Sequence, residues 1–519
     1  MPFGHLFLWC RDAAVSKALL LLRLQKPRSG YMEKVVIIGA GISGLAVAYR
    51  LKRLGIPSLV LEASSRPGGV IATTRRKGFL FETGPQFPRF PAPLWQLVRE
   101  LNLDGEFVAG NSAANRYILR RGQLHPAPFS PMGVIKTRLV GISSKLRILA
   151  DPFGYSQPPD HEESLAEFIR RKFGREILDN LVDPFISTVF LGDASKMGME
   201  SAFPALVEWE RRKGSLLRGA LSARKARRNP SAPIAAAPRP SVRAGTRVGT
   251  NGNGNKLHVT EALPALGSFR SGMAILPERL ADDLGRAVRY NIPVAAIAPT
   301  RHGDASATSN WQISLSDGTS ISTEHVVLAV PAHVASIFLT RSAPEIASLL
   351  GGIEYAPICV VSSVYNRSAV RNTLDGFGFL VPRNEGLRTI CTFWNSSLFS
   401  GRAPEGNVVI TTFARRERSG GVVDPAGDAF VRAVDVENSQ VLGISGAPLD
   451  REVSEDPRAL PQYNVGHALR VKKISATLRS LPNLHLAGNY LSGRSIGECV
   501  DVANRVAEDL HSQLEVPVI

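Results

Sequence analysis

The segment VVIIGAGISGLAVAYRLKRLG, residues 35–55, constrains the fold more than any other part of this 519-residue chain. Four consecutive apolar residues predict a buried strand, and the stretch after the glycines predicts a helix. Between them, Gly39, Gly41 and Gly44 form a GxGxxG turn. The first glycine permits the tight turn, the second admits a pyrophosphate, and the third lets helix and strand pack closely. The pattern predicts an α/β fold with a Rossmann-like dinucleotide site at the helix N-terminus.

The residues that follow indicate whether the dinucleotide is FAD or NAD. Glu62 ends the next strand 18 residues after Gly44, where a carboxylate can accept both hydroxyls of an adenosine ribose. Arg66 with the glycines at 68–69 forms a second glycine turn, suited to backbone contacts with a longer cofactor. The loop ETGPQ, residues 82–86, would bring main chain against a ring system beyond the pyrophosphate. This order of loops favours FAD over NAD.

A second strand, glycine turn and helix lie near the C-terminus, in LHLAGNYLSGRSIGECVDVANRVAEDL. The amides at the start of that helix can point at the far end of an extended FAD. We expect Gly488 and Asn489 at the ribityl-phosphate region and Arg494, Ser495 and Ile496 at the flavin. Both ends of the chain would then hold one cofactor.

The charge of the chain is concentrated in two segments. Residues 211–256 carry 12 Lys and Arg and no acid, and residues 1–31 carry five basic residues and one Asp, which leaves one unit of the formal +17 for the rest. The body is therefore nearly neutral, and a nucleic-acid partner is not expected. No run of about 18 uncharged apolar residues predicts a membrane-spanning helix. The four widely spaced cysteines indicate reduced thiols in an intracellular protein and no metal site.

Several strings resemble known proteins. GAGISGLAVAY, LEASSRPGG and the C-terminal glycine turn resemble the FAD-dependent amine oxidase and desaturase superfamily. DPFISTVFLGDASKMGMESAFPALVEWERRKGSLLRGAL, GSFRSGMAILPERLADDL, SSLFSGRAPEG and above all ALPQYNVGHALR resemble the oxygen-dependent protoporphyrinogen oxidase family. The resemblance runs from about Lys34 to Leu510. PQYNVGH and the DPF, GD and AFP positions argue against an amine oxidase or a carotenoid desaturase.

The resemblance implies a Rossmann-like FAD-binding domain, a mixed-sheet substrate domain and a small helical lobe that docks on a membrane surface. It implies oxidation of protoporphyrinogen IX to protoporphyrin IX in haem or porphyrin synthesis, in three two-electron steps with molecular oxygen reduced to hydrogen peroxide. Coproporphyrinogen III, which differs in propionate count, stays open as the substrate. A rival of another class is a flavin-fold binding protein without turnover, whose basic segment serves as an arm.

The expected division of the chain places cofactor and substrate segments alternately. The parts are 1–31, a leader or disordered extension; 32–110, the first part of the FAD-binding domain; 111–220, the substrate and helical membrane-associated lobe; 221–258, a flexible basic insertion; 259–330, the second part of the FAD-binding domain; 331–470, the substrate domain; and 471–519, the C-terminal part of the FAD-binding domain.

The resemblance also assigns site residues. The FAD positions are Gly39, Ala40, Gly41, Ile42, Ser43, Gly44, Glu62, Ala63, Arg66, Gly68, Gly69, Gly84, Pro85, Gln86, Val294, Gly488, Asn489, Arg494, Ser495 and Ile496. The substrate positions are Arg116, which would pair with a propionate, and Gly378, Phe379 and Trp394, which would pack on the tetrapyrrole. Because hydride passes to the flavin and ring protons can leave to solvent, no catalytic base is expected, and His467 is interpreted as structural.

Three features stay open at this stage. Arg494 departs from the small apolar residue usual in the family, and its guanidinium either lies near the flavin N1 and C2 oxygen or points to solvent. Residues 131–153 have apolar side chains at near-helical spacing between Lys and Arg, which fits either a segment in a membrane interface or an internal helix against the substrate lobe. The family resemblance favours peripheral contact with a membrane, the inner membrane if the source is bacterial. A homodimer and organelle targeting by residues 1–31 remain possible.

Overall fold

The computed structural model describes residues 32–111, 114–128, 131–153, 159–228, 249–250, 256–257, 266–300, 310–416 and 427–515. The predicted leader, 1–31, lies outside the described residues, and so does most of the predicted basic insertion. Its first residues continue the helix α11, Leu216–Arg228. Within the described part of the chain, no helix is long and apolar enough to cross a membrane.

The first sheet carries both glycine turns. Its strand order is β11-β2-β1-β14-β13-β12, with β20 also paired to β14. The bounds are β1 Met32–Ile38, β2 Ser58–Leu61, β11 Val288–Arg289, β12 Val294–Thr300, β13 Asn310–Leu315, β14 Ser320–Leu328 and β20 Leu484–Leu486. The strands β11, β2, β1, β14 and β20 are joined by parallel pairing, while β12 and β13 pair antiparallel. The predicted Rossmann-like sheet is confirmed.

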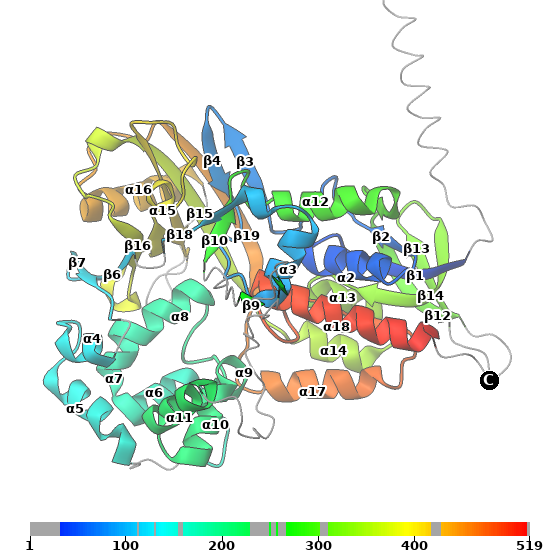
Figure 1. Ribbon diagram of the computed structural model, residues 1–519, viewed down its shortest axis with the longest axis horizontal. Coiled ribbons are helices and arrows are strands. Elements are labelled where there is room, and N and C mark those ends of the chain that lie inside the picture. The colour runs from blue at the N-terminus through cyan, green and yellow to red at the C-terminus, as the bar shows by residue number, and fades with distance from the viewer. Residues whose placement is uncertain are drawn as a thin grey trace, which may run out of the picture.

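Helices cover both faces of this sheet, which explains why VVII in β1 is apolar without alternation. Val35 and Ile37 enter one core and Val36 and Ile38 the other. The helices of the first core are α2 Ile42–Arg53, α3 Ala92–Glu100, α12 Ile275–Leu284 and α18 Ile496–Glu515. Those of the second are α13 Ala332–Leu339, α14 Pro344–Gly351 and α17 His467–Leu478. Figure 1 shows α12 and α18 beside α2.

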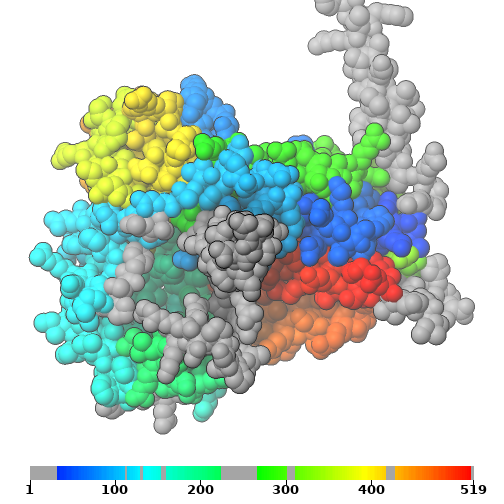
Figure 2. Space-filling view, in the orientation of Figure 1, coloured from blue at the N-terminus to red at the C-terminus, as the bar shows by residue number. Residues whose placement is uncertain are grey.

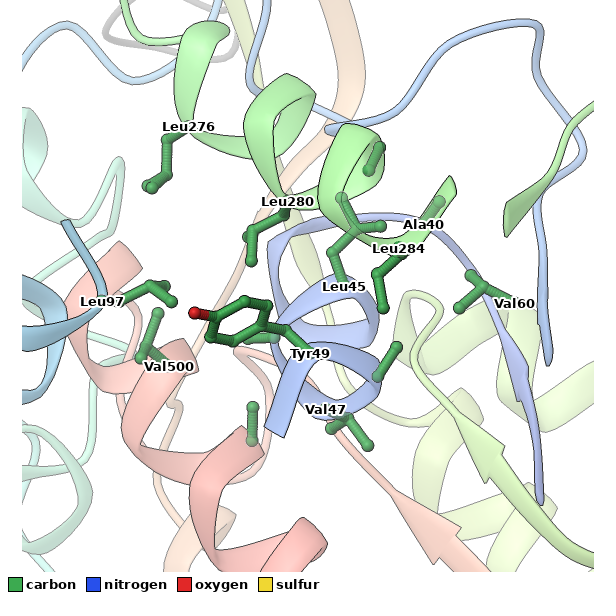
Figure 3. Close-up of a cluster of buried hydrophobic side chains, with 14 of the residues drawn as sticks. Ala40, Leu45, Val47, Tyr49, Val60, Leu97, Leu276, Leu280, Leu284 and Val500 are labelled. Carbon is green, nitrogen blue, oxygen red and sulfur yellow. The ribbon is translucent and has the colours of Figure 1, made fainter. Parts of the chain in front are cut away.

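The first core joins the two ends of the chain. Leu45 and Tyr49 of α2 are buried against Leu280 of α12 and Val500 of α18 (Figure 3). The helix that follows the first glycine turn therefore packs on the helix that follows the second. Burying side chains of this size contributes about 1.5–3 kcal/mol each.

The second sheet is mixed. Its order is β19-β15-β18-β17-β16-β6-β7, in which only β16 and β6 pair in parallel. The bounds are β6 Asn115–Arg120, β7 Gln123–Pro126, β15 Tyr355–Asn366, β16 Gly376–Leu380, β17 Thr389–Phe393, β18 Asn407–Ala414 and β19 Asp450–Pro461. The associated helices are α15 Asn395–Leu398 and α16 Asp428–Leu442.

A helical lobe lies beside this sheet (cyan to green in Figures 1 and 2), while the first-sheet region lies on the other side of the view. Its helices are α4 Pro131–Lys136, α5 Ile142–Ala150, α6 Leu165–Phe173, α7 Arg175–Ile177, α8 Asp183–Val189, α9 Met199–Ala202, α10 Pro204–Lys213 and α11. Ser164 and Glu167 form a capping box that begins α6. The predicted fold class, with a mixed second sheet and a helical lobe, is confirmed.

Three short strand pairs stand apart from the two large sheets in the described part of the chain. They are β3 Thr73–Arg76 with β4 Phe79–Glu82, β5 Phe107–Ala109 with β10 Gly267–Phe269, and β8 Gly249–Thr250 with β9 Lys256–Leu257. Arg76 pairs with Asp450 at 3.0 Å and with Glu452 on β19. Glu82 and Arg402 form a buried ion pair at 2.9 Å. These contacts fix the loop after β4 between the sheets.

Candidate cofactor and substrate site

The first glycine turn is packed on one side and open on the other. A Cβ on Gly44 would lie 2.0 Å from the carbonyl oxygen of Gly39, and Gly39 itself has φ +105°. A Cβ on Gly41 would meet nothing within 4 Å. The third glycine is therefore needed for packing, while the second leaves space above the backbone.

The N-terminus of α2 is the natural place for an anion. Gly41 occupies the N-cap position, no side chain caps the helix, and its first turn has no acidic residue. The first N–H groups of a helix need partners from outside it. The uncapped N–H groups and the space beside Gly41 fit a cofactor pyrophosphate.

Glu62 is fixed next to this turn. One carboxylate oxygen accepts the Ala40 N–H at 2.7 Å, and the other accepts the Ser64 N–H at 2.9 Å and hydroxyl at 2.8 Å. A carboxylate has about four acceptor sites, so one remains for a ribose hydroxyl. Ile292 donates its N–H to the Glu62 carbonyl at 2.9 Å, which brings the chain before Val294 to the same end of the site.

The turn at residues 66–69 faces the first one. Gly68 donates its N–H to the Ala40 carbonyl at 2.8 Å, and a Cβ on Gly69 would lie 3.5 Å from the Cα of Gly41. The Arg66 guanidinium donates to the carbonyls of Gly69 at 2.8 Å and of Ile71 at 3.2 Å. Arg66 therefore holds its own loop in shape, and the loop contributes backbone to the site.

The ETGPQ loop reaches the second sheet. A Cβ on Gly84 would lie 1.9 Å from the Val70 carbonyl oxygen. Gln86 donates to the carbonyls of Glu82 and Gly84, and its side-chain oxygen accepts from Asn395 at 2.9 Å. The loop is thus rigidly placed between cofactor turn and substrate sheet.

The second glycine turn is built differently. The N–H groups of Arg494 and Ser495 each donate to one carboxylate oxygen of Glu498 at 2.9 Å, and the Ser495 hydroxyl donates to it at 2.8 Å. Glu498 donates its N–H back to that hydroxyl at 3.2 Å. The start of α18 is therefore capped by its own side chains. Asn489 accepts the Tyr463 hydroxyl through its carbonyl at 2.6 Å.

The Arg494 side chain is enclosed by aromatic rings. Its guanidinium lies 3.8 Å from the ring centroid of Phe190 and 4.2 Å from that of Tyr463. Its Nη1 is buried without a hydrogen-bond partner among the described residues, and burial lowers the pKa of Arg494 to about 10. This placement excludes the solvent-facing alternative. Contact with the flavin stays a prediction.

His467 packs on Tyr463, one of the two rings that enclose Arg494. Its ring stacks on Tyr463 with centroids 4.2 Å apart. Burial, together with the charges of Arg470 and Arg494, lowers the pKa of His467 to about 4, so the ring is neutral at pH 7. Its position between packed groups agrees with the structural interpretation.

The predicted substrate residues do not all lie on the same side of the second sheet. Residues opposite each other across a ladder share a side. Gly378 lies opposite Arg116 and Phe393, whereas Phe379 lies opposite Thr392. The Thr392 hydroxyl donates to Asn438 of α16 at 2.9 Å. We call the side of Arg116, Gly378 and Phe393 the lobe side, because α8 packs there, and the other the α16 side.

Phe379 and Trp394 belong to the core on the α16 side, where they are 2% and 0% exposed. Their predicted stacking on a substrate ring remains untested, but such a ring would not reach their side chains in this structure. Phe393, one residue before Trp394, is partly exposed on the lobe side. Sequence reasoning missed it, although the period-two alternation of β17 carried the signal.

An aromatic group lines the junction of cofactor loop and lobe side. Phe87, directly after Gln86, lies 5.8 Å from Phe377 and 5.1 Å from Phe393, both edge to face. The Arg116 guanidinium lies 3.9 Å from the Phe377 ring centroid. Burial and the charge of Arg89 lower the pKa of Arg116. A cation beside apolar rings fits a flat apolar ligand that carries carboxylates.

Comparison with known proteins identifies the family of the chain. A family model described as flavin-containing amine oxidoreductase matches residues 42–511, and the chain belongs to that family. It is a flavin oxidoreductase whose cofactor is FAD. Within the family, protoporphyrinogen oxidase 1 of Arabidopsis thaliana chloroplasts is 33% identical over 493 residues, covering 92% of this chain and 88% of that protein.

Two further proteins are similar to the chain over most of its length. Coproporphyrinogen III oxidase of Bacillus subtilis is 26% identical over 494 residues, covering 92% of this chain and 97% of that protein. A crystal structure from Exiguobacterium sp. 255-15, provisionally named protoporphyrinogen oxidase, has a TM-score of 0.72 at 24% identity, covering 93% of this chain and all of that one. The structural likeness supports the fold.

Proposed function

We propose that this enzyme oxidises protoporphyrinogen IX to protoporphyrin IX in haem synthesis. The observation that carries the proposal is the aromatic group on the lobe side with Arg116 beside it, next to the cofactor loop that ends at Gln86. The plant relative named above is a protoporphyrinogen oxidase at 33% identity. A tetrapyrrole with propionate side chains matches apolar walls and a cation better than an amine does.

The two glycine turns would hold FAD, which would supply the two-electron oxidation chemistry for each of three steps, with molecular oxygen as the final acceptor and hydrogen peroxide as its product. The chain orients the substrate. Arg116 pairs with a propionate, and the rings of Phe87 and Phe393 enclose the macrocycle and exclude water. Protons from the pyrrole N–H groups leave to solvent, so no protein base is required.

Residues 131–153 support association with a membrane surface. Ile142, Leu146, Leu149 and Phe153, spaced on one helical face, are 76%, 60%, 51% and 69% exposed. Lys145 and Arg147 lie between them. Such a face binds peripherally at a bilayer interface. We propose that the enzyme lies on the inner membrane, where its apolar substrate is held, if the source is bacterial.

The test uses the full chain loaded with FAD. Purified enzyme is incubated in air with protoporphyrinogen IX, coproporphyrinogen III or a set of primary amines. Porphyrin fluorescence, oxygen uptake and peroxide are followed. We expect fluorescence from porphyrinogens, with three peroxides per porphyrin, and no peroxide from amines. Peroxide from amines alone would contradict the proposal. Size-exclusion chromatography of the same sample tests the predicted homodimer.

A further inference from the structure

A buried ion pair stands at the start of the ETGPQ loop, where the β3–β4 hairpin meets the second sheet. Glu82 is the last residue of β4, and Arg402 lies in the segment before β18. Their side chains are 2% and 3% exposed, and Oε1 of Glu82 lies 2.9 Å from Nη1 of Arg402. Leu80 donates its N–H to the Arg402 carbonyl at 3.0 Å. Backbone and side chain of Arg402 therefore bind the same strand.

The Glu82 carboxylate also holds the start of α12. Its Oε1 accepts the Met273 N–H at 2.9 Å, and its Oε2 accepts the Thr73 hydroxyl at 2.6 Å. The Thr73 hydroxyl oxygen in turn accepts the N–H of the N-cap residue of α12 at 3.1 Å. A Cβ on Gly68 would lie 2.9 Å from Pro277, in the first turn of α12. One carboxylate thus fixes the helix end on which that glycine turn packs.

The energetics of the pair indicate more than a contribution to stability. Nη2 of Arg402 donates to the Ser268 hydroxyl, so the guanidinium also reaches β10. Burial lowers the pKa of Arg402 and raises the pKa of Glu82, and in each case the charge of the partner opposes the shift. The attraction between two buried charges often does not repay the cost of removing them from water. Stability alone is therefore a weak reason for an ion pair at this place.

Two routes connect the pair to the cofactor site. Along the chain, Gly84 is two residues after Glu82, and its backbone packs so closely on Val70 that a Cβ would lie 1.9 Å from the Val70 carbonyl oxygen. The second route is α12, whose first turn packs on Gly68. Both routes end on the turn that faces Gly41, beside the space that fits a pyrophosphate. The pair therefore determines where the loop and the turn stand relative to that space.

We infer that Glu82 and Arg402 are positioning residues for FAD, which hold the ETGPQ loop and the 66–69 turn in the conformation that receives the cofactor. A site that is already formed binds more tightly than one that must be ordered on binding. The inference concerns the cofactor and holds for any substrate of this flavin enzyme, so its failure would leave the proposed function untouched.

The experiment uses the full chain as wild type, Arg402→Met, the double variant Glu82→Gln with Arg402→Met, and the control Arg76→Met. Arg76 pairs with Asp450 at the opposite end of the same hairpin. FAD is removed and titrated back. Flavin fluorescence gives the Kd, visible circular dichroism reports the surroundings of the bound flavin, and urea unfolding of the apoprotein gives the stability.

Arg402→Met should raise the Kd for FAD by about tenfold and change the circular dichroism of the bound flavin, because the loop must then be ordered on binding. Arg76→Met should lose stability yet keep the Kd within about twofold of wild type. The double variant has no unpaired buried carboxylate, so it should be more stable than Arg402→Met. Without the guanidinium, its Kd should stay about tenfold above that of wild type.

A Kd that returns to the wild-type value in the double variant would show that the pair acts only on stability and would overturn the inference. An unchanged Kd in Arg402→Met, or an equal rise in Arg76→Met, would overturn it as well. Should Arg402→Met not fold, Arg402→Lys takes its place, since lysine keeps the charge but lacks the planar fork. We expect Arg402→Lys to raise the Kd by about threefold with little loss of stability. A wild-type Kd in that variant would overturn the inference.

Discussion

The two glycine turns differ in what they leave open. At the first, residues 39–44, no side chain caps the helix and Gly41 faces free space. At the second, residues 488–496, Glu498 already binds the N–H groups of Arg494 and Ser495. An uncapped N-terminus attracts anions, whereas a carboxylate cap neutralises that attraction. The first turn is thus suited to the charged pyrophosphate, and the second to the uncharged flavin end of the same cofactor.

The largest effect should come from crowding the first turn. Gly44→Ala places a methyl group against the Gly39 carbonyl, so we expect it to lower the free energy of unfolding by about 3 kcal/mol and to abolish FAD binding. Gly41→Ala is the matched control. It should leave the apoprotein within about 0.5 kcal/mol of wild type and still weaken FAD binding. Urea unfolding of apoprotein and flavin absorbance measure both, and equal destabilisation by the two changes would contradict the comparison.

The second prediction concerns how the stability of the protein depends on pH through His467, which packs next to the second turn. The pKa of His467 in the folded protein is about 4, below its ordinary 6.5, so the unfolded chain binds the proton first. Its contribution to stability is complete above pH 6.5 and is lost as pH falls toward 4, by about 3 kcal/mol. His467→Gln should unfold with a shallower pH dependence over that range. His485, whose pKa is also about 4, stays in both proteins and cancels. Parallel curves would show that His467 does not titrate this way.

The next largest effect on stability should come from substituting Arg494, which is enclosed by aromatic rings. Arg494→Met removes two cation–π contacts and should cost about 1–2 kcal/mol. Arg494→Lys should lose less, because it keeps the charge. Redox titration of the flavin adds a readout that packing alone would not move. A shifted midpoint potential in Arg494→Met, with Arg494→Lys at the wild-type value, would mean that the charge reaches the flavin.

The smallest effect should come from uncapping α18. Glu498→Ala removes the acceptor of two N–H groups and should cost about 1 kcal/mol. Glu498→Gln keeps an acceptor and should cost less than half of that. Thermal midpoints of the apoprotein measure both. If Glu498→Ala were neutral, the capped state of the second turn would not describe the protein in solution.

The sequence predicts the cofactor sheet well because its signals are local. GxGxxG, the VVII strand and Glu62 lie within 30 residues, and each local preference agrees with the same turn. The arrangement of residues on the lobe side of the second sheet could not be predicted in the same way. β6 and β16 pair across more than 250 residues, so only coordinates bring Arg116 level with Gly378.

Two side chains show what the sequence could not supply. Trp394 resembles a ring-binding residue, but the strand alternation turns it to α16 and turns Phe393 to the lobe side. The sequence left the Arg494 guanidinium either near the flavin or pointing to solvent. In the structure, Phe190 from the helical lobe and Tyr463 enclose it. Both outcomes depend on partners distant in sequence, which propensity and spacing do not encode.

The pairing of β20 with β14 has a consequence for how the protein is made. Leu484–Leu486 adds to a sheet whose other strands end at Leu328, and α18 then packs on α2. Contacts between residues so far apart slow folding. During synthesis the pyrophosphate turn emerges more than 400 residues before its covering helix. The part of α2 that α18 covers therefore stays exposed until α18 has left the ribosome.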